Sequence, residues 1–145
     1  MRHWLKGLIL LPLFVFAAPA QAAILPGTAV DGPSNTIDSA SRPDVDVAPD
    51  GSAALVYLKS DGEQTHPFVS RLVNGAWSSP QRVDSDSSVT NSLPRIAVAN
   101  GGKVVVTYIR GLLGAAVARI SPPPGAPFGA EHIVQAGGSF TDVDL

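Results

Sequence analysis

The sequence predicts an all-β fold made of two repeated four-stranded antiparallel meanders, and three observations support this prediction. Residues 43–59 (PDVDVAPDGSAALVYLK) are written again as residues 94–110 (PRIAVANGGKVVVTYIR), an offset of 94 − 43 = 51 positions. Short apolar runs are separated by turn dipeptides such as Asn74-Gly75. The composition, with 15% charged residues, 14 Gly and 13 Pro, favours short strands and tight turns over long helices.

The internal repeat is the strongest of these observations. A fixed period of about 50 residues indicates a repeat architecture. The aligned positions that are identical in the two copies are Pro43/Pro94, Val47/Val98, Ala48/Ala99, Gly51/Gly102 and Tyr57/Tyr108.

The chain begins with a stretch that has the three parts of a secretory signal. Arg2 and Lys6 give a positive start, residues 8–18 form an apolar core, and Ala20-Gln21-Ala22 is a small-residue cleavage site. We expect cleavage after Ala22 and a secreted or periplasmic mature protein. The apolar run is shorter than the roughly 20 residues that a spanning helix needs, so no membrane span is expected after cleavage.

The first unit, at about residues 43–84, contains four predicted strands. These are residues 43–48, 53–58, 67–73 and 76–83. The first alternates apolar Val45 and Val47 with polar residues, which is the period of a half-buried strand. The second is an unbroken apolar run, as expected for a strand covered on both faces. Gly51 supplies the turn between the first and second strands, and Asn74-Gly75 supplies the turn between the third and fourth.

The second unit repeats this plan at about residues 94–135, and partial units flank the pair. Residues 142–145 (DVDL) match residues 44–47 (DVDV), so a third unit starts at Asp142. Residues 28–31 match residues 81–84 and predict a detached last strand. Four-stranded meanders at this period are typical of β-propeller blades, so residues 23–145 are predicted to form part of a propeller.

A propeller ring normally takes about 4 to 8 blades, and two full blades cannot close one. The chain is therefore expected to be either the front end of a longer propeller, which we favour, or a protein whose copies assemble. For the 145-residue chain itself we expect self-association, because a dozen apolar side chains left partly bare favour it. A compact monomer would instead indicate that the two units pack as a small β-sandwich.

Charge and cysteine content exclude several classes of function. Removing Arg2 and Lys6 with the leader leaves 10 − 2 = 8 basic against 12 acidic residues, so no nucleic acid partner is expected. The absence of cysteine excludes disulfides, thiolate metal sites and a cysteine nucleophile. The Gly101-Gly102 pair lies in a hairpin and not at a strand-to-helix junction, and no cofactor is expected.

Residues 75–83 (GAWSSPQRV), with Pro43 and Asp50-Gly51 upstream, carry a family resemblance. This pattern resembles the repeat of secreted bacterial sialidase-like (BNR-type) β-propellers, over residues 24–145. The Asp-box of sialidases, Ser-x-Asp-x-Gly-x-x-Trp, is absent. The resemblance therefore implies a propeller scaffold and carries no catalytic residue over to this chain.

Two aromatic residues are the candidate ligand-binding positions. Trp77 and its counterpart Phe128 each start a fourth strand, where a ring could stack on a sugar or wedge between blades. Packing is the favoured role, because burial of large aromatic area dominates core energetics. Tyr57 and Tyr108, in the second strands, are predicted to be core residues.

Four aspartates form the alternative metal site. Asp44, Asp46, Asp142 and Asp144 lie two apart on first strands, and a ring of such carboxylates could hold Ca²⁺. The second unit has Arg95 and Ala97 at these positions, so Asp–Arg pairing between units or plain solvation is favoured over metal. His66 and His132 have no partner at metal-ligand spacing.

These features predict an exported, non-enzymatic β-propeller module that binds a ligand, such as a glycan or cell-surface material, through loops at one end. The alternative is the N-terminal part of a sialidase-like glycoside hydrolase whose catalytic residues lie beyond Leu145.

Overall fold

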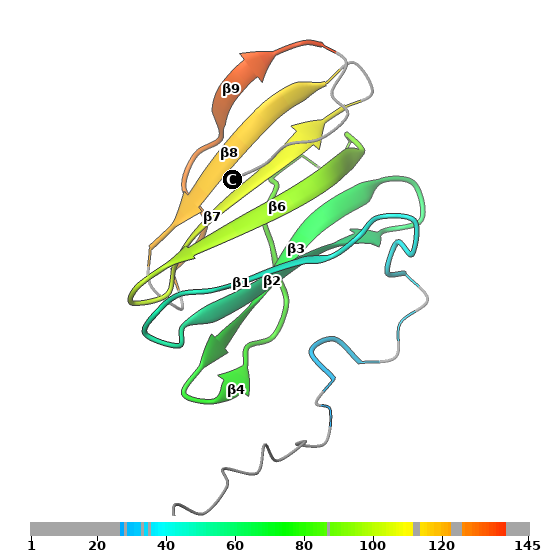
Figure 1. The fold of residues 1–145 in the computed structure, drawn as a ribbon. Coiled ribbons are helices and arrows are strands. Elements are labelled where there is room, and N and C mark those ends of the chain that lie inside the picture. The colour runs from blue at the N-terminus through cyan, green and yellow to red at the C-terminus, as the bar shows by residue number, and fades with distance from the viewer. Residues whose placement is uncertain are drawn as a thin grey trace, which may run out of the picture.

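A computed structural model describes residues 27–138 except 28, 33, 35, 87, 112–113 and 123–125. The predicted leader (residues 1–22) and the predicted start of a third unit (residues 142–145) lie outside the described residues. The described part of the chain consists of strands and turns without a helix, so the all-β prediction is confirmed (Figure 1). It accordingly has no helical segment suited to crossing a membrane.

The strands form two antiparallel sheets (Figure 1). The first sheet consists of β1 (Asp44–Val47), β2 (Ala53–Ser60), β3 (Thr65–Val73), β4 (Ala76–Trp77) and β5 (Gln81–Arg82), with β4 and β5 both paired to β3. The second sheet consists of β6 (Asn91–Ala99), β7 (Lys103–Arg110), β8 (Ala115–Ser121) and β9 (His132–Ala136), in that order. The predicted fourth strand over residues 76–83 is divided into β4 and β5, because Pro80 between them has no N–H to continue the ladder.

The two sheets share one register. Val45 lies opposite Leu55 in the first sheet, and Ile96 lies opposite Val106 in the second. The differences are 96 − 45 = 51 and 106 − 55 = 51, so the offset found in the sequence is kept in the strand pairing.

The predicted turns are confirmed by backbone geometry. Gly51 and Gly102 have φ angles of 84° and 73°, a region that a β-carbon disfavours. Asn74 and Gly75 both have positive φ, at 50° and 78°, which is the pattern of a two-residue hairpin turn that follows the twist of its strands.

The core lies between the two sheets. Its buried side chains are Ala54, Val56 and Val69 from the first sheet, Val83 from the loop after β5, and Ile96, Val104, Val106, Tyr108 and Val117 from the second sheet. Each fully buried Val or Ile stabilises the fold by roughly 1.5 to 3 kcal/mol. Tyr57 and Tyr108 are 5% and 0% exposed, as predicted for core residues.

The sheets meet through opposite faces of the repeat. The first sheet buries the face that carries Ala54 and Val56. The second sheet buries the face that carries Val106 and Tyr108, which correspond at the 51-residue offset to Leu55 and Tyr57. Because successive side chains of a strand alternate between faces, the two units pack front to back and not face to matching face. We call the two remaining sheet faces the outer faces.

In strand β1 the valines face away from the second sheet. Val45 and Val47 are 58% and 62% exposed, whereas Asp44 and Asp46 are half-buried. The strand alternates as predicted, but the aspartates face the second sheet because its backbone N–H groups need acceptors there.

The segment before β1 differs from the predicted detached strand, since residues 29–32 adopt no strand. Asp31 instead accepts hydrogen bonds from the Tyr57 hydroxyl at 2.9 Å and from the Lys59 Nζ at 2.8 Å. The Lys59 contact is the main cause that lowers the pKa of Asp31. Ile37 forms an isolated bridge with Lys59, which holds this segment along β2.

Candidate functional site

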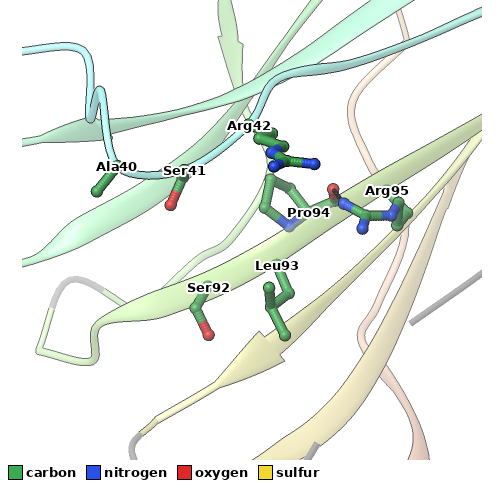
Figure 2. Close-up of a pocket in the computed structure, with 7 residues that line it drawn as sticks. All are labelled: Ala40, Ser41, Arg42, Ser92, Leu93, Pro94 and Arg95. Carbon is green, nitrogen blue, oxygen red and sulfur yellow. Dashed lines mark hydrogen bonds between the residues drawn. The ribbon is translucent and has the colours of Figure 1, made fainter. Parts of the chain in front are cut away.

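A cleft of about 320 Å³ opens where the two units enter their first strands. One wall comes from the loop before β1 and the other from β6 (Figure 2). The lining residues are Ala40, Ser41, Arg42, Ser92, Leu93, Pro94 and Arg95. Ser41 and Ser92 are equivalent in the repeat, as are Arg42 and Leu93, so the cleft lies between matching segments of neighbouring units.

The loop wall is fixed by a short polar turn. Asp38 accepts a hydrogen bond from the Ala40 N–H at 3.0 Å and another from the Ser41 hydroxyl at 2.8 Å. An aspartate that bonds the backbone two residues later holds a tight turn. This turn sets the direction in which the exposed Arg42 leaves the loop.

The strand wall is shaped by a bulge in β6. The pairing with β7 shifts between Ser92 and Arg95, and Leu93 adopts a positive φ of 49°. The ring of Pro94 is fully buried and offers no N–H to the ladder. A β-bulge redirects side chains, and here it places Ser92 and Leu93 along the cleft.

The cleft combines polar donors with a small apolar surface. Two guanidinium groups donate to hydroxyls or to anionic oxygens, and the hydroxyls of Ser41 and Ser92 both donate and accept. The Arg95 Nη1 also donates to the Pro94 carbonyl at 3.1 Å, which fixes part of its side chain. Leu93 adds an apolar contact. Such a set suits a hydroxylated ligand that also has C–H faces.

The two predicted aromatic residues do not line this cleft. Trp77 is half-buried on β4, where it pairs with Leu72. Phe128 packs against the core, and the Arg71 guanidinium lies 5.4 Å from its ring centre. Arg71 also donates to the Pro122 carbonyl at 3.2 Å. Phe128 is therefore placed at the junction of the two sheets.

Asp44 and Asp46 make a ladder between β1 and β6. Their Oδ2 atoms accept hydrogen bonds from the backbone N–H groups of Ile96 at 2.9 Å and Val98 at 2.7 Å. Their Oδ1 atoms accept from the N–H groups of Val45 and Val47 in their own strand. We call this set the aspartate ladder.

The ladder accounts for these carboxylates without a metal ion. Their partners are backbone N–H groups, where the sequence suggested arginine or solvent. Within the described residues, no group of three or more His, Asp or Glu side chains is placed to hold a metal. Asp142 and Asp144, the other half of the suggested site, lie outside this part of the chain.

A buried histidine cluster was missed by sequence reasoning. His66 is 1% exposed, with its Nδ1 2.8 Å from Asp84 Oδ2 and its Nε2 2.9 Å from Asp61 Oδ2. Arg82 Nε lies 2.7 Å from Asp84, and Asn91 Nδ2 donates to Asp84 at 2.9 Å. The cluster joins β3, the end of the first unit and the start of β6. No short motif signals it, because its members come from separate segments.

Comparison with known proteins gives this chain no family. No family model matches it, and no match was found among curated proteins. The likeness of residues 75–83 to sialidase-like repeats therefore stays a prediction. What is established, for the described residues, is an all-β fold of two antiparallel sheets, of five and four strands, with a cleft between matching segments of the two units.

Proposed function

We propose that this chain is part of an exported, non-enzymatic β-propeller module that binds a glycan or similar cell-surface material in the cleft between its units. The observation that carries the proposal is the position of the cleft, between equivalent segments of two repeated sheets. In repeat proteins, surfaces formed by neighbouring units are the usual places for ligands.

The front-to-back packing supports propeller blades over a closed two-sheet sandwich. In a ring of blades, each blade presents one face to the preceding blade and the opposite face to the next. The two units of this chain meet in this way, through Val56 on one side and Val106 on the other. A sandwich of two equivalent sheets would bury matching faces and leave no face for a third unit.

The chemistry of the cleft favours a sugar-like ligand. Its volume of about 320 Å³ is at the lower end of the range for small-molecule sites, which is roughly 300 to 1,000 Å³. Arg42 and the two serines offer hydrogen bonds, and Leu93 offers an apolar patch for C–H groups. In the histidine cluster, by contrast, the side chains of His66 and Asp84 are only 2% and 1% exposed, which favours binding over catalysis.

Export forms the second part of the proposal. It depends on the leader at residues 1–22, which precedes the described residues. When the chain is expressed in a bacterium, the mature protein is expected outside the cytoplasm with Ala23 as its first residue. N-terminal sequencing of the fractionated cells tests this, and an intact leader on membrane-bound protein would contradict it.

Ligand binding is tested first on a glycan array and then by calorimetric titration of the strongest hit. Arg42→Ala should weaken binding about tenfold or more, since a hydrogen bond to a charged group contributes about 1.5 to 3 kcal/mol. Lys103→Ala removes an exposed cation outside the cleft and should leave the affinity unchanged.

Two outcomes would overturn the assignment of the cleft. The first is an array without any bound glycan. The second is a ligand whose affinity survives Arg42→Ala and is lost in Trp77→Ala, which would move the site to the aromatic position predicted from the sequence.

A further inference from the structure

The outer face of the first sheet exposes apolar side chains that have buried counterparts in the same molecule. Val45 and Val47 are 58% and 62% exposed, with Leu55 half-buried beside them. At the 51-residue offset, Val45 corresponds to Ile96, which is 4% exposed because the first sheet covers it. Along β1 and the start of β2, the first sheet therefore presents the surface that the second sheet buries, whereas Tyr57 farther along β2 is already covered, at 5% exposure, beside Asp31.

The outer face of the second sheet presents the complementary surface. Ile120 is 44% exposed, and Val105, opposite it in the register, is half-buried with Ala97 on its other side. Val105 corresponds at the same offset to Ala54, which belongs to the face that covers Ile96. Each outer face thus corresponds to one half of the interface already present between the two sheets.

The hydrogen bonds of strands β1 and β6 are consistent with a contact between the two outer faces. In the existing interface, the N–H of Ile96 needs the carboxylate of Asp44 from the neighbouring strand. The N–H groups of Val45 and Val47 are already bonded by the Oδ1 atoms of their own aspartates, at 3.1 and 2.8 Å. Strand β1 therefore needs no carboxylate from a neighbour.

Strand β6 is suited to be that neighbour. It has Arg95 and Ala97 at the positions where β1 has Asp44 and Asp46, so it offers no carboxylate at these positions. The outer face of the second sheet in one copy and the outer face of the first sheet in another therefore match in apolar surface and in hydrogen bonding.

We propose that the outer face of the first sheet binds the outer face of the second sheet in another copy of this chain, head to tail. The contact repeats the interface between the two sheets and is heterologous, so it generates a ring where the rotation closes and an open filament where it does not. With two sheets in each copy, a ring of about 4 to 8 sheets takes about two to four copies. This inference does not depend on a ligand in the cleft.

The test uses the full chain and light scattering over a series of concentrations. The parent should assemble. Val47→Asp blocks one face and Ile120→Asp blocks the other, so each variant alone should remain a monomer. An equimolar mixture should form a dimer of one copy of each, because each variant keeps the face that the other needs. Val134→Asp changes a side chain that is 67% exposed on the edge strand β9, and this control should assemble like the parent.

Three results would overturn the proposal. They are a parent that stays monomeric at every concentration, a Val47→Asp variant that still assembles, and a mixture of the two variants that gives no dimer. Cooperative unfolding of each variant at the midpoint of the parent, with the parent diluted until it is monomeric, shows that a loss of assembly is not a loss of fold. Assembly abolished by Val134→Asp alone is a fourth result that would overturn the proposal, because it would assign the contact to the edge of β9.

Discussion

Replacing Asp46 by Ala tests whether the aspartate ladder holds the two sheets together. The Oδ2 atom of Asp46 accepts the Val98 N–H at 2.7 Å, in a half-buried position between β1 and β6. A hydrogen bond to a charged group contributes about 1.5 to 3 kcal/mol, and part of it is recovered when water reaches the freed N–H. We expect Asp46→Ala to lower the free energy of unfolding by about 2 kcal/mol.

Urea denaturation followed by far-UV circular dichroism measures this loss. For a small domain the slope is about 1 to 3 kcal/mol per M, so a change of about 2 kcal/mol moves the midpoint down by roughly 0.7 to 2 M. Parent and variant are compared at one protein concentration, because self-association would otherwise shift the midpoint by mass action.

The matched control is Asp38→Ala. The hydrogen bonds of Asp38 stay within its own turn, at Ala40 and Ser41, so this variant should change stability by no more than about 0.5 kcal/mol. An unchanged midpoint for Asp46→Ala, or an equal fall for both variants, would refute the role given to the ladder.

Three further variants address the turns, the electrostatics and the core. Gly51→Val should lower the free energy of unfolding by roughly 1 kcal/mol or more, because the φ of Gly51 is 84°. Gly32 also has no atom close to the position of an added β-carbon, but its φ is not positive, so Gly32→Val should lower it less. The urea midpoints of the two variants compare these effects. The pKa of Asp61 is lowered to about 2, chiefly by the Gln64 N–H. A carboxyl group whose pKa is lower in the folded than in the unfolded state stabilises the fold at pH values above its unfolded pKa of about 3.9. The contribution of Asp61 to the free energy of unfolding should therefore fade as the pH drops from about 4 to 2. It should be absent in Asp61→Asn, and unfolding curves measured across this pH range compare the two proteins. Val106→Ala, at a position with 0% exposure, should cost about 1.6 kcal/mol for two lost methyl groups plus a cavity penalty, and a thermal midpoint equal to the parent's would contradict the core assignment.

The meanders and their turns could be predicted because they depend on local chemistry. Asn74-Gly75 and Gly51 determine where the chain reverses, and alternation indicates a strand without knowledge of its neighbours. The fourth strand is confirmed only in part. Its interruption before β5 follows from Pro80, which has no N–H to donate to the ladder.

The burial of β1 could not be predicted, because it depends on which neighbour covers the strand. Val45 and Val47 would be buried by a preceding unit, as Ile96 is, but the described part of the chain places no such unit there. Alternation alone gives two faces and does not say which of them meets a partner.

The cleft and the histidine cluster were missed for a related reason. Each is assembled from segments far apart in the chain, such as the loop at Ser41 and the bulge at Ser92. The one signal available was the repeat itself, because equivalent residues of neighbouring units lie close together. His66 has no equivalent histidine in the second unit, so the repeat does not predict its cluster.

The pattern of identity between the units separates structural positions from variable ones. Pro43/Pro94, Gly51/Gly102 and Tyr57/Tyr108 are identical, and in each unit they fix a turn, a strand entry or the core. The positions that differ most are polar ones at the junction, where Arg42 stands opposite Leu93 and Asp44 corresponds to Arg95.

A repeat that keeps its turns and core while varying its junctions forms chemically different clefts on one scaffold. In an assembly of such units, the cleft between the two sheets of one chain would carry Arg42 and Leu93 on opposite walls. The cleft at a contact between copies would instead bring Ser92 and Leu93 of one chain against Ser41, Arg42 and Asp44 of the next, so that Asp44 takes the place that Arg95 has in the cleft within each chain. Ligand specificity would then differ between the two kinds of junction, and Arg42→Ala would weaken binding at both, whereas Arg95→Ala would affect only the cleft within each chain.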